Sequence, residues 1–245
     1  MFGYGIDRKT LYIILGVLAL ISFLGMNRIE MLSMILTFPA VIIAITFHEF
    51  AHAWMADKLG DTTPRSQGRL TLNPTSHLDP VGFVLLMFAH IGWGKPVQIN
   101  PNNFTSNKSK GMCEALVSLA GPVMNFIIAI VLSFVYVIID INNYNFYDTS
   151  IGSIVDILLQ VTIVVNIGLG VFNLIPLPPL DGEKIFRQIL PYRVQEWLDT
   201  NYNTIHFIFM ILWITGLLGT IVSPVIMIVQ KGIWWFVGQV VGLFL

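Results

Sequence analysis

The chain contains 245 residues, of which 55% are hydrophobic and only 11% are charged. Soluble globular domains usually carry about 25% charged residues, so this composition excludes an ordinary water-soluble domain, a disordered chain and a coiled coil. The formal net charge of −1 leaves no excess of lysine and arginine for binding a phosphate backbone, and no nucleic-acid partner is expected. The single cysteine, Cys113, excludes an intramolecular disulfide and a metal site built from several cysteines.

Apolar stretches that approach or exceed the roughly 20 residues of a membrane-spanning helix recur along the chain. In chain order they are residues 11–26, 31–56, 115–139, 151–177 and 204–222. Ser223 and Pro224 then interrupt the pattern, and residues 225–245 are again apolar although they include Gln230 and Lys231. We therefore expect an all-α polytopic membrane protein with five to six transmembrane helices, in which 225–245 either crosses the membrane or lies in its interface.

The apolar stretch 81–93 is too short to cross a bilayer. Thirteen helical residues extend about 20 Å, whereas the hydrocarbon core is about 30 Å thick. We expect this stretch to be a short internal helix or a re-entrant segment.

The distribution of positive charge predicts the orientation of the spans. If residues 81–93 do not cross, all but Arg28 and Lys231 of the 13 lysine and arginine residues fall on one side of the membrane. The loop 140–150 on the other side contains two aspartates and no lysine or arginine. Because cytoplasmic loops carry the excess of positive charge, the basic side is expected to face the cytoplasm.

The second apolar stretch ends in His48-Glu49-Phe50-Ala51-His52, which is an HExxH motif. Histidines four apart on a helix project from one face, so both imidazoles can bind a single metal ion. The glutamate beside the first ligand can then act as a general base toward a metal-activated water. Ionisable residues at the end of a lipid-facing segment are costly, which favours a metal site over coincidence.

A catalytic zinc needs three protein ligands and one open position. Lys58 stands where one HExxH family places a third histidine, and residues 53–113 contain no glutamate. The remaining candidates are His77 and Asp79, for which turn or capping roles are simple alternatives, and Asp181. Asp181 follows the proline-rich end of the fourth span, which reaches the same side of the membrane as His52, although it could instead cap the next helix.

Five blocks of sequence between positions 48 and 182 carry a family resemblance. They are His48-Glu49-Phe50-Ala51-His52; Gly68-Arg69-Leu70-Thr71-Leu72-Asn73-Pro74 with His77-Leu78-Asp79-Pro80; Gly92-Trp93-Gly94-Lys95-Pro96-Val97; Ser118-Leu119-Ala120-Gly121-Pro122 with Asn125; and Asn173, Pro176, Pro179, Asp181 and Gly182. With these blocks in this order, the chain resembles the site-2 proteases, which are intramembrane zinc metalloproteases. It is most similar in kind to the small bacterial and archaeal members without a PDZ domain.

The resemblance implies a set of functional residues. One Zn²⁺ per chain would be held by His48, His52 and Asp181, and Glu49 would be the catalytic glutamate. Asn173 falls on the family asparagine that is thought to help hold the substrate or the oxyanion.

Two further polar or glycine positions remain candidates for substrate contact. The segment near 81–100, which includes Gly94, would be a re-entrant hairpin with a β-like element whose edge pairs with an unwound substrate. Residues 95–99 look strand-like, although Pro96 limits pairing to one side. Asn125 either lines the active cavity or bridges helices by a hydrogen bond.

The resulting functional hypothesis is a zinc metalloendopeptidase that cleaves membrane-protein substrates in or near their transmembrane segments, as in regulated intramembrane proteolysis. Residues 1–245 would form one membrane-embedded domain, with a catalytic core at about 31–190 and flanking spans at 11–26 and 204–245. We expect a multi-pass protein of a bacterial or archaeal cytoplasmic membrane, with its active site toward the cytoplasm. Its partners would be lipid, a transmembrane substrate and an unidentified gating or regulatory membrane partner.

Non-hydrolytic membrane proteins are the alternative hypothesis. A metal transporter would need several ligands along a path across the membrane, whereas His90 and His206 are isolated. A scaffold that only binds metal or helices would not need Glu49.

Overall fold

The computed structural model describes residues 16–17, 20–89 and 92–243, and this part of the chain is helical with no strand longer than an isolated bridge. The longer helices are α2 (Arg28–Lys58), α5 (Lys110–Asn142), α6 (Ser150–Asn173) and α10 (Leu217–Gly242). The shorter ones are α3 (Thr63–Ser66), α4 (Pro80–Ala89), α7 (Asp181–Arg187), α8 (Tyr192–Thr200) and α9 (Tyr202–Ile214), with single 3₁₀ turns at Pro74–Ser76 and Pro101–Asn103.

Within the part of the chain that the structure describes, four helices, α2, α5, α6 and α10, are long and apolar enough to cross a membrane. The expected all-helical membrane fold is therefore confirmed, and the second, third and fourth expected spans correspond to α2, α5 and α6. The first expected span, 11–26, lies partly outside the described residues (11–15 and 18–19), and its described part is helical at 16–17 and 20–25.

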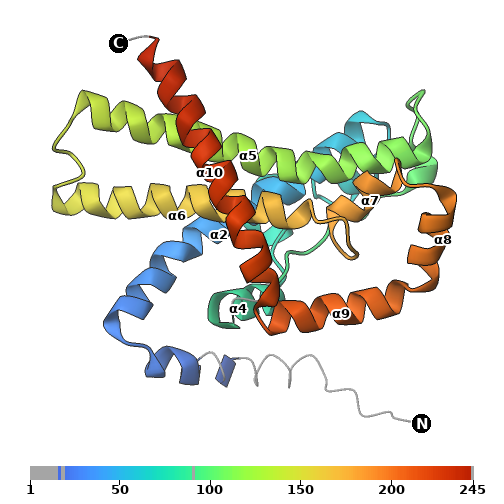
Figure 1. Cartoon of the computed structure of the whole chain (residues 1–245), viewed down its shortest axis with the longest axis horizontal. Coiled ribbons are helices and arrows are strands. Elements are labelled where there is room, and N and C mark those ends of the chain that lie inside the picture. Colours follow the sequence, from blue (N-terminus) through green and yellow to red (C-terminus); the bar gives the residue numbers. More distant parts are fainter. Residues whose placement is uncertain (1–15, 18–19, 90–91, 244–245) are drawn as a thin grey trace.

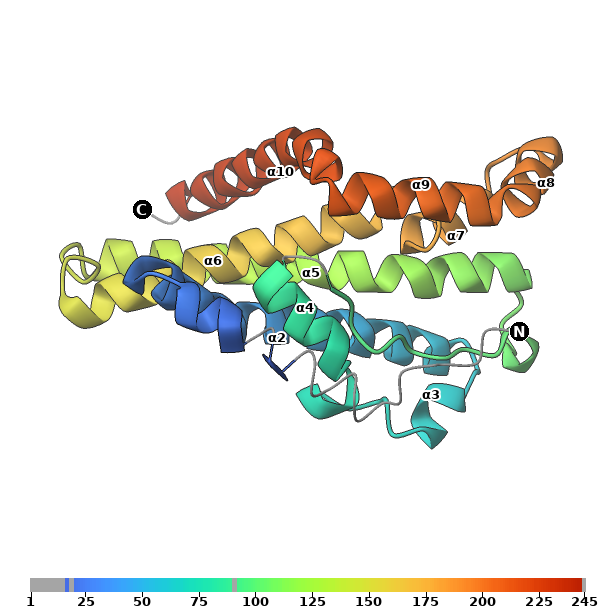
Figure 2. The ribbon, with the colours of Figure 1, turned by 90° about the horizontal axis from the view of Figure 1, so that it is seen from below.

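The long helices are arranged in three layers. Helices α5 and α6 run side by side and antiparallel, and α10 crosses over them (Figure 1). Helices α9 and α10 cover one side of this pair, while α2 and α4 lie on the other side (Figure 2). The apolar core between α5, α6 and α10 is formed by Ala129, Ile163, Ile167, Val171, Val222, Ile233 and Val237.

The expected division of the C-terminal region is wrong. The chain breaks at Gly216, which has a φ of +75°, and not at Ser223-Pro224. Glycine adopts this left-handed conformation without a steric penalty, so it ends the helical path where another residue would be strained. Pro224 instead lies inside α10, and α9, with 13 residues, is shorter than a membrane span.

The other differences lie around the prolines and the short apolar stretch. Helix α6 ends at Asn173 and not at residue 177, because Pro176 lacks the N–H that a continuing helix would need. Residues 80–89 form the short helix α4, as expected for a segment that does not cross. The expected β-like element is reduced to a single antiparallel bridge between Leu78 and Gly94.

Candidate metal centre

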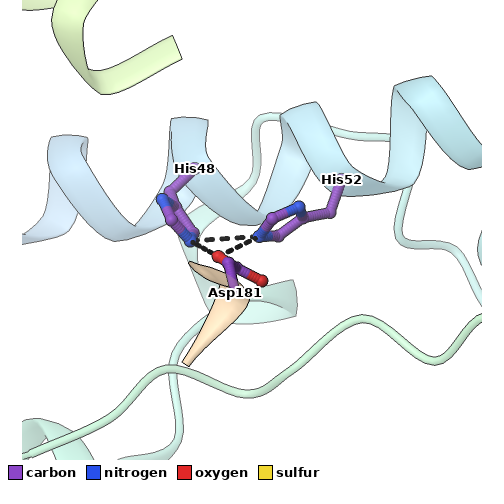
Figure 3. Close-up of side chains that lie close together, drawn as sticks. All are labelled: His48, His52 and Asp181. Atoms are coloured by element: carbon purple, nitrogen blue, oxygen red, sulfur yellow. Dashed lines mark hydrogen bonds and ion pairs between the residues drawn. The ribbon is translucent and has the colours of Figure 1, made fainter. Parts of the chain in front are cut away.

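Two helices bring three metal-binding side chains together. His48 and His52 project from one face of α2, and Asp181 is the first residue of α7, after the proline-containing turn that follows α6. The Asp181 Oδ2 atom lies 3.2 Å from the Nε2 atoms of both histidines, and these two nitrogens are 3.0 Å apart (Figure 3). Among the described residues, these three side chains form the one cluster of at least three His, Cys, Asp or Glu residues that could hold a metal ion.

The three donors fit a zinc ion. Zinc–ligand bonds of about 2.0–2.1 Å in a tetrahedron separate the donor atoms by about 3.3 Å, close to the observed 3.0–3.2 Å. The Nδ1 atoms of His48 and His52 face the oxygens of Asn125 and Val117, each at 2.7 Å, so each Nδ1 carries the proton and donates it. Both Nε2 lone pairs therefore point at a carboxylate oxygen, an arrangement that a cation stabilises.

Helix α5 leaves room for the imidazoles at Gly121. A Cβ atom at this position would lie 2.6 Å from His52 Nε2 and 2.7 Å from His48 Cε1. These distances are too short for real contacts, so only glycine allows α5 to pack against α2 with both rings in place.

A buried chain of amide hydrogen bonds supports His48. Asn125 accepts from His48 Nδ1 and donates to Ala44 O and to Asn166 Oδ1, at 3.1 and 3.0 Å. Asn166 in turn donates to Thr162 O at 2.8 Å. Of the two roles expected for Asn125, the structure places its side chain in helix bridging, because it is fully buried between α2, α5 and α6.

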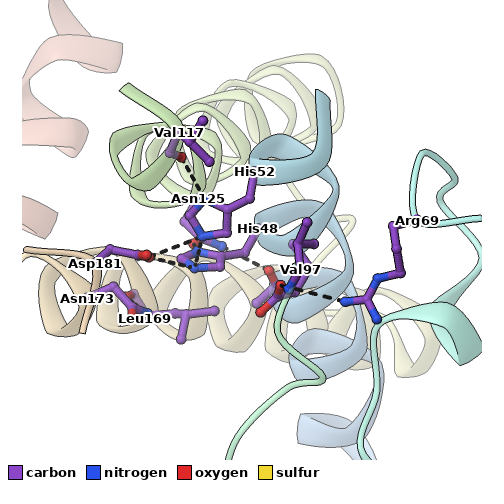
Figure 4. Close-up of polar contacts among 11 residues, drawn as sticks. His48, His52, Arg69, Val97, Val117, Asn125, Leu169, Asn173 and Asp181 are labelled. Atoms are coloured by element: carbon purple, nitrogen blue, oxygen red, sulfur yellow. Dashed lines mark hydrogen bonds and ion pairs between the residues drawn. The ribbon is translucent and has the colours of Figure 1, made fainter. Parts of the chain in front are cut away.

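Glu49 faces the loop that follows α4 and has two neighbours there. Its Oε2 atom accepts a hydrogen bond of 3.0 Å from the Val97 backbone N–H and lies 3.9 Å from Arg69 Nη2 (Figure 4). Gly94 passes so close to α2 that a Cβ would lie 2.8 Å from Ile45 Cγ2 and 3.4 Å from Glu49 Oε1. Gly94 is therefore a site of close approach between the loop and the helix.

The metal-binding side chains and Glu49 line a cavity of about 410 Å³. Asn173 also lines it and donates a hydrogen bond to Leu169 O at 3.0 Å. Phe172, Phe209 and Trp213 form an aromatic wall, with ring centroids 5.5–5.9 Å apart. The site thus combines a polar end at the metal-binding side chains with an apolar wall from α6 and α9.

The alternative third ligands lie elsewhere. His77 is fully buried, its Nε2 is 2.7 Å from Thr71 O, and burial lowers its pKa below the ordinary value, so the ring is neutral and supports the loop. Asp79 accepts a hydrogen bond from Gly82 N–H at the start of α4, as a helix cap does. Asp181 is not the N-cap of its own helix: that position is Leu180, and Asp181 is the first helical residue.

Comparisons with known proteins agree with this geometry. The sequence profile of peptidase family M50 matches residues 138–217, a region that includes Asp181. A Bacillus subtilis protein named "Putative zinc metalloprotease YwhC" is 36% identical over 186 residues, which cover 76% of this chain and 83% of the relative. The chain belongs to peptidase family M50.

Two further relatives match over shorter regions. A Mycolicibacterium smegmatis protein named "Putative zinc metalloprotease Rip2" is 31% identical over 66% of this chain and 61% of its own length. The protein named "Zinc metalloprotease MJ0392" of Methanocaldococcus jannaschii is 30% identical over 62% of this chain and 34% of its own length. No solved structure gives a significant match. As a member of this site-2 protease family with four apolar helices, the chain is an intramembrane zinc metalloprotease.

Three residues around the site were not predicted from the sequence as functional candidates. Arg69 and Gly121 stood only within blocks of family resemblance, and Asn166 stood in an apolar span. A polar residue such as Asn166 in a membrane span is itself a signal of a buried hydrogen bond. Sequence spacing gave no corresponding signal that Arg69 would face Glu49.

Proposed function

We propose that His48, His52 and Asp181 hold the catalytic zinc of this protease and that Glu49 is its general base. The observation that carries the proposal is the convergence of two Nε2 atoms and one carboxylate oxygen within 3.2 Å of one another, beside a glutamate that lines the same cavity. Zinc bound there would act as a Lewis acid that polarises a peptide carbonyl and lowers the pKa of water toward about 7.

The protein side chains divide the remaining tasks. Glu49 takes a proton from the attacking water and delivers it to the leaving amine. The Asn173 amide group has two N–H bonds, and Leu169 O accepts from one of them. The second is available to donate to the carbonyl oxygen as negative charge develops on it.

The substrate is a transmembrane segment that unwinds before cleavage, because helical hydrogen bonds otherwise shield its peptide bonds. Val97 and Ile99 both line the cavity, and alternate residues of an extended chain face the same side. An unwound substrate lies along this extended segment. The N–H of Lys95 already donates to His77 O, and its carbonyl accepts from Arg69, so the pairing edge is shorter than residues 95–99.

We extend the proposal to the whole chain. Residues 1–245 form one membrane-embedded domain with its catalytic core at about 31–190. The protein resides in a bacterial or archaeal cytoplasmic membrane with its active site toward the cytoplasm, where it takes part in regulated intramembrane proteolysis. Access to the site is under the control of a membrane partner.

The test is elemental analysis of detergent-purified protein, combined with cleavage of single-span reporter proteins in liposomes. The reporters carry glycine-proline or asparagine at the centre of the span, where unwinding is easiest. We expect about one zinc per chain in the native protein and in Glu49→Gln, clear loss of zinc in Asp181→Ala, and cleavage by the native protein alone. Full zinc in Asp181→Ala, or native-like cleavage by Glu49→Gln, would contradict the assignment.

A further inference from the structure

Arg69 is a buried cation close to the proposed general base. Its side chain is only 6% exposed, although it belongs to a loop outside the long helices. A buried guanidinium is stable only when carboxylates or carbonyls compensate its charge. Among the described residues, Glu49 is the acidic residue within ion-pair distance of Arg69, with 3.9 Å between Arg69 Nη2 and Glu49 Oε2.

The Nη2 atom of Arg69 makes two contacts with the site. It donates a hydrogen bond to Lys95 O, and it faces Glu49 Oε2. In Figure 4, Arg69 lies on the side of His48 opposite Asp181, so the positive guanidinium approaches Glu49 from the side away from the metal-binding carboxylate.

The loop that follows α4, which contains Lys95 and Val97, also contacts this carboxylate oxygen of Glu49. Lys95 is fixed by its own N–H, which donates to His77 O at 2.8 Å. Two residues later, the Val97 N–H donates to Glu49 Oε2 at 3.0 Å. Arg69 therefore acts on Glu49 both directly, through its charge, and indirectly, by holding the loop that presents the Val97 N–H.

We propose that Arg69 is the positioning residue for Glu49, which fixes the carboxylate in the orientation needed for proton transfer without touching the substrate. This inference rests on the proposed role of Glu49. Proton transfer depends steeply on geometry, so a carboxylate free to rotate loses rate even when zinc and substrate bind normally.

Two substitutions separate charge from hydrogen bonding. Arg69→Gln keeps a donor for Lys95 O but removes the charge, whereas Arg69→Lys keeps the charge but has a single ammonium group in place of the planar fork. Arg65→Gln is the matched control, because Arg65 is four residues earlier, is 63% exposed and pairs with Asp57 outside the cavity.

The experiment measures kcat and KM for the reporter helix, zinc per chain, and the affinity of zinc-loaded protein for acetohydroxamic acid. A hydroxamate on the metal shares a proton with the general base, so its affinity reports the position of Glu49 without turnover. In Arg69→Gln we expect kcat to fall roughly 10- to 100-fold with KM within about twofold of the native value. Hydroxamate affinity should fall in parallel, and zinc should remain at about one per chain.

Arg69→Lys is expected to recover part of the lost kcat, and Arg65→Gln should match the native protein. A native kcat in Arg69→Gln, a loss of zinc, or no recovery in Arg69→Lys would overturn the inference. If Arg69→Gln does not fold, Arg69→Lys decides alone. A kcat below the native value with unchanged KM and zinc supports the inference, and a native kcat overturns it.

Failure of the inference is distinguishable from failure of the proposed function. If Glu49→Gln is inactive while Arg69→Gln is fully active, Glu49 keeps its role and only the role of Arg69 is wrong. If Glu49→Gln is as active as the native protein, the assignment of the general base is wrong, and with it the inference that depends on it.

Discussion

Gly121 determines how closely α5 approaches the two metal-binding imidazoles. In Gly121→Ala the added methyl group would occupy space within 2.7 Å of atoms of both rings, so the rings must turn away from Asp181. We expect zinc affinity to fall by at least 10- to 100-fold, the loss typical of disturbed support for a ligand. Gly168→Ala is the matched control, because a Cβ there meets its nearest neighbour at 3.7 Å. Elemental analysis should find native zinc in the control, and native zinc in Gly121→Ala would contradict the steric argument.

The amide chain behind His48 predicts a graded effect on zinc binding. Asn125→Leu leaves the His48 Nδ1–H without its acceptor, so zinc affinity should fall about 10- to 100-fold. Asn166→Leu removes only one of the two acceptors of Asn125, because Ala44 O remains, and its effect should be smaller. Competition with a chromogenic chelator measures both affinities. A larger loss in Asn166→Leu than in Asn125→Leu would reverse the expected order and refute this network.

At the scale of single residues, the sequence predicts candidate metal-binding side chains better than it predicts the residues that hold them in place. The spacing of His48 and His52 follows from helix geometry, and the direction of the spans favoured Asp181 over His77 and Asp79 as the third ligand. Gly121 and Asn166 act through contacts between residues 41 to 73 positions apart, and Arg69 acts through a loop. Such contacts depend on how helices pack, which the local pattern of residues does not determine.

Among the connecting elements, Asp61 joins the end of α2 to the segment that follows Val97. The buried Asp61 carboxylate accepts hydrogen bonds from Thr63 N–H, Asn100 N–H and the Asn103 side chain, at 3.0, 2.6 and 3.1 Å. Burial raises the pKa of Asp61, but these donors outweigh it and hold the pKa below its ordinary value of 3.8. The resulting stabilisation is fully present above the unfolded-state pKa and is lost as pH falls through the lower, folded-state pKa.

Asp61→Asn should therefore destabilise the protein at neutral pH, because an amide nitrogen cannot accept from these donors. We expect a loss of about 1–3 kcal/mol, the cost of leaving buried donors unpaired. Thermal unfolding of zinc-depleted protein should show the largest difference between native and variant above about pH 5, with the difference shrinking below about pH 4. A difference that stays constant across this range would show that the charge of Asp61 is not responsible.

Element boundaries were harder to predict than element types. The apolar runs identified α2, α5 and α6, but Pro39, Pro122 and Pro224 all lie inside helices. Proline is tolerated in membrane helices because neighbouring helices and side chains satisfy the freed carbonyl groups. This is why Pro224 gave a false boundary, whereas Gly216, an inconspicuous residue in an apolar run, ends α9 through its backbone conformation.

For the molecule as a whole, the distribution of positive charge and the position of the metal-binding side chains bear on the same question, which is the orientation of the chain in the membrane. The metal-binding side chains lie where α2 and α6 approach the basic loops, and α5 begins at Lys110 beside those loops. The loop 143–149 joins the opposite ends of α5 and α6 and contains no lysine or arginine. On the positive-inside rule, we propose that the metal-binding end faces the cytoplasm and that residues 143–149 lie outside.

Cysteine labelling of intact cells tests this orientation. Cys113 is buried, and replacing it with alanine gives a cysteine-free background in which Asn107→Cys and Asn145→Cys each provide one exposed thiol. A membrane-impermeant maleimide should label Asn145→Cys in intact cells and label Asn107→Cys only after permeabilisation. Because both loops flank the same helix, α5, a membrane-inserted chain must give opposite results at the two positions. The reverse pattern would place the metal-binding end outside the cell, and labelling of both positions in intact cells would mean that α5 does not span the membrane.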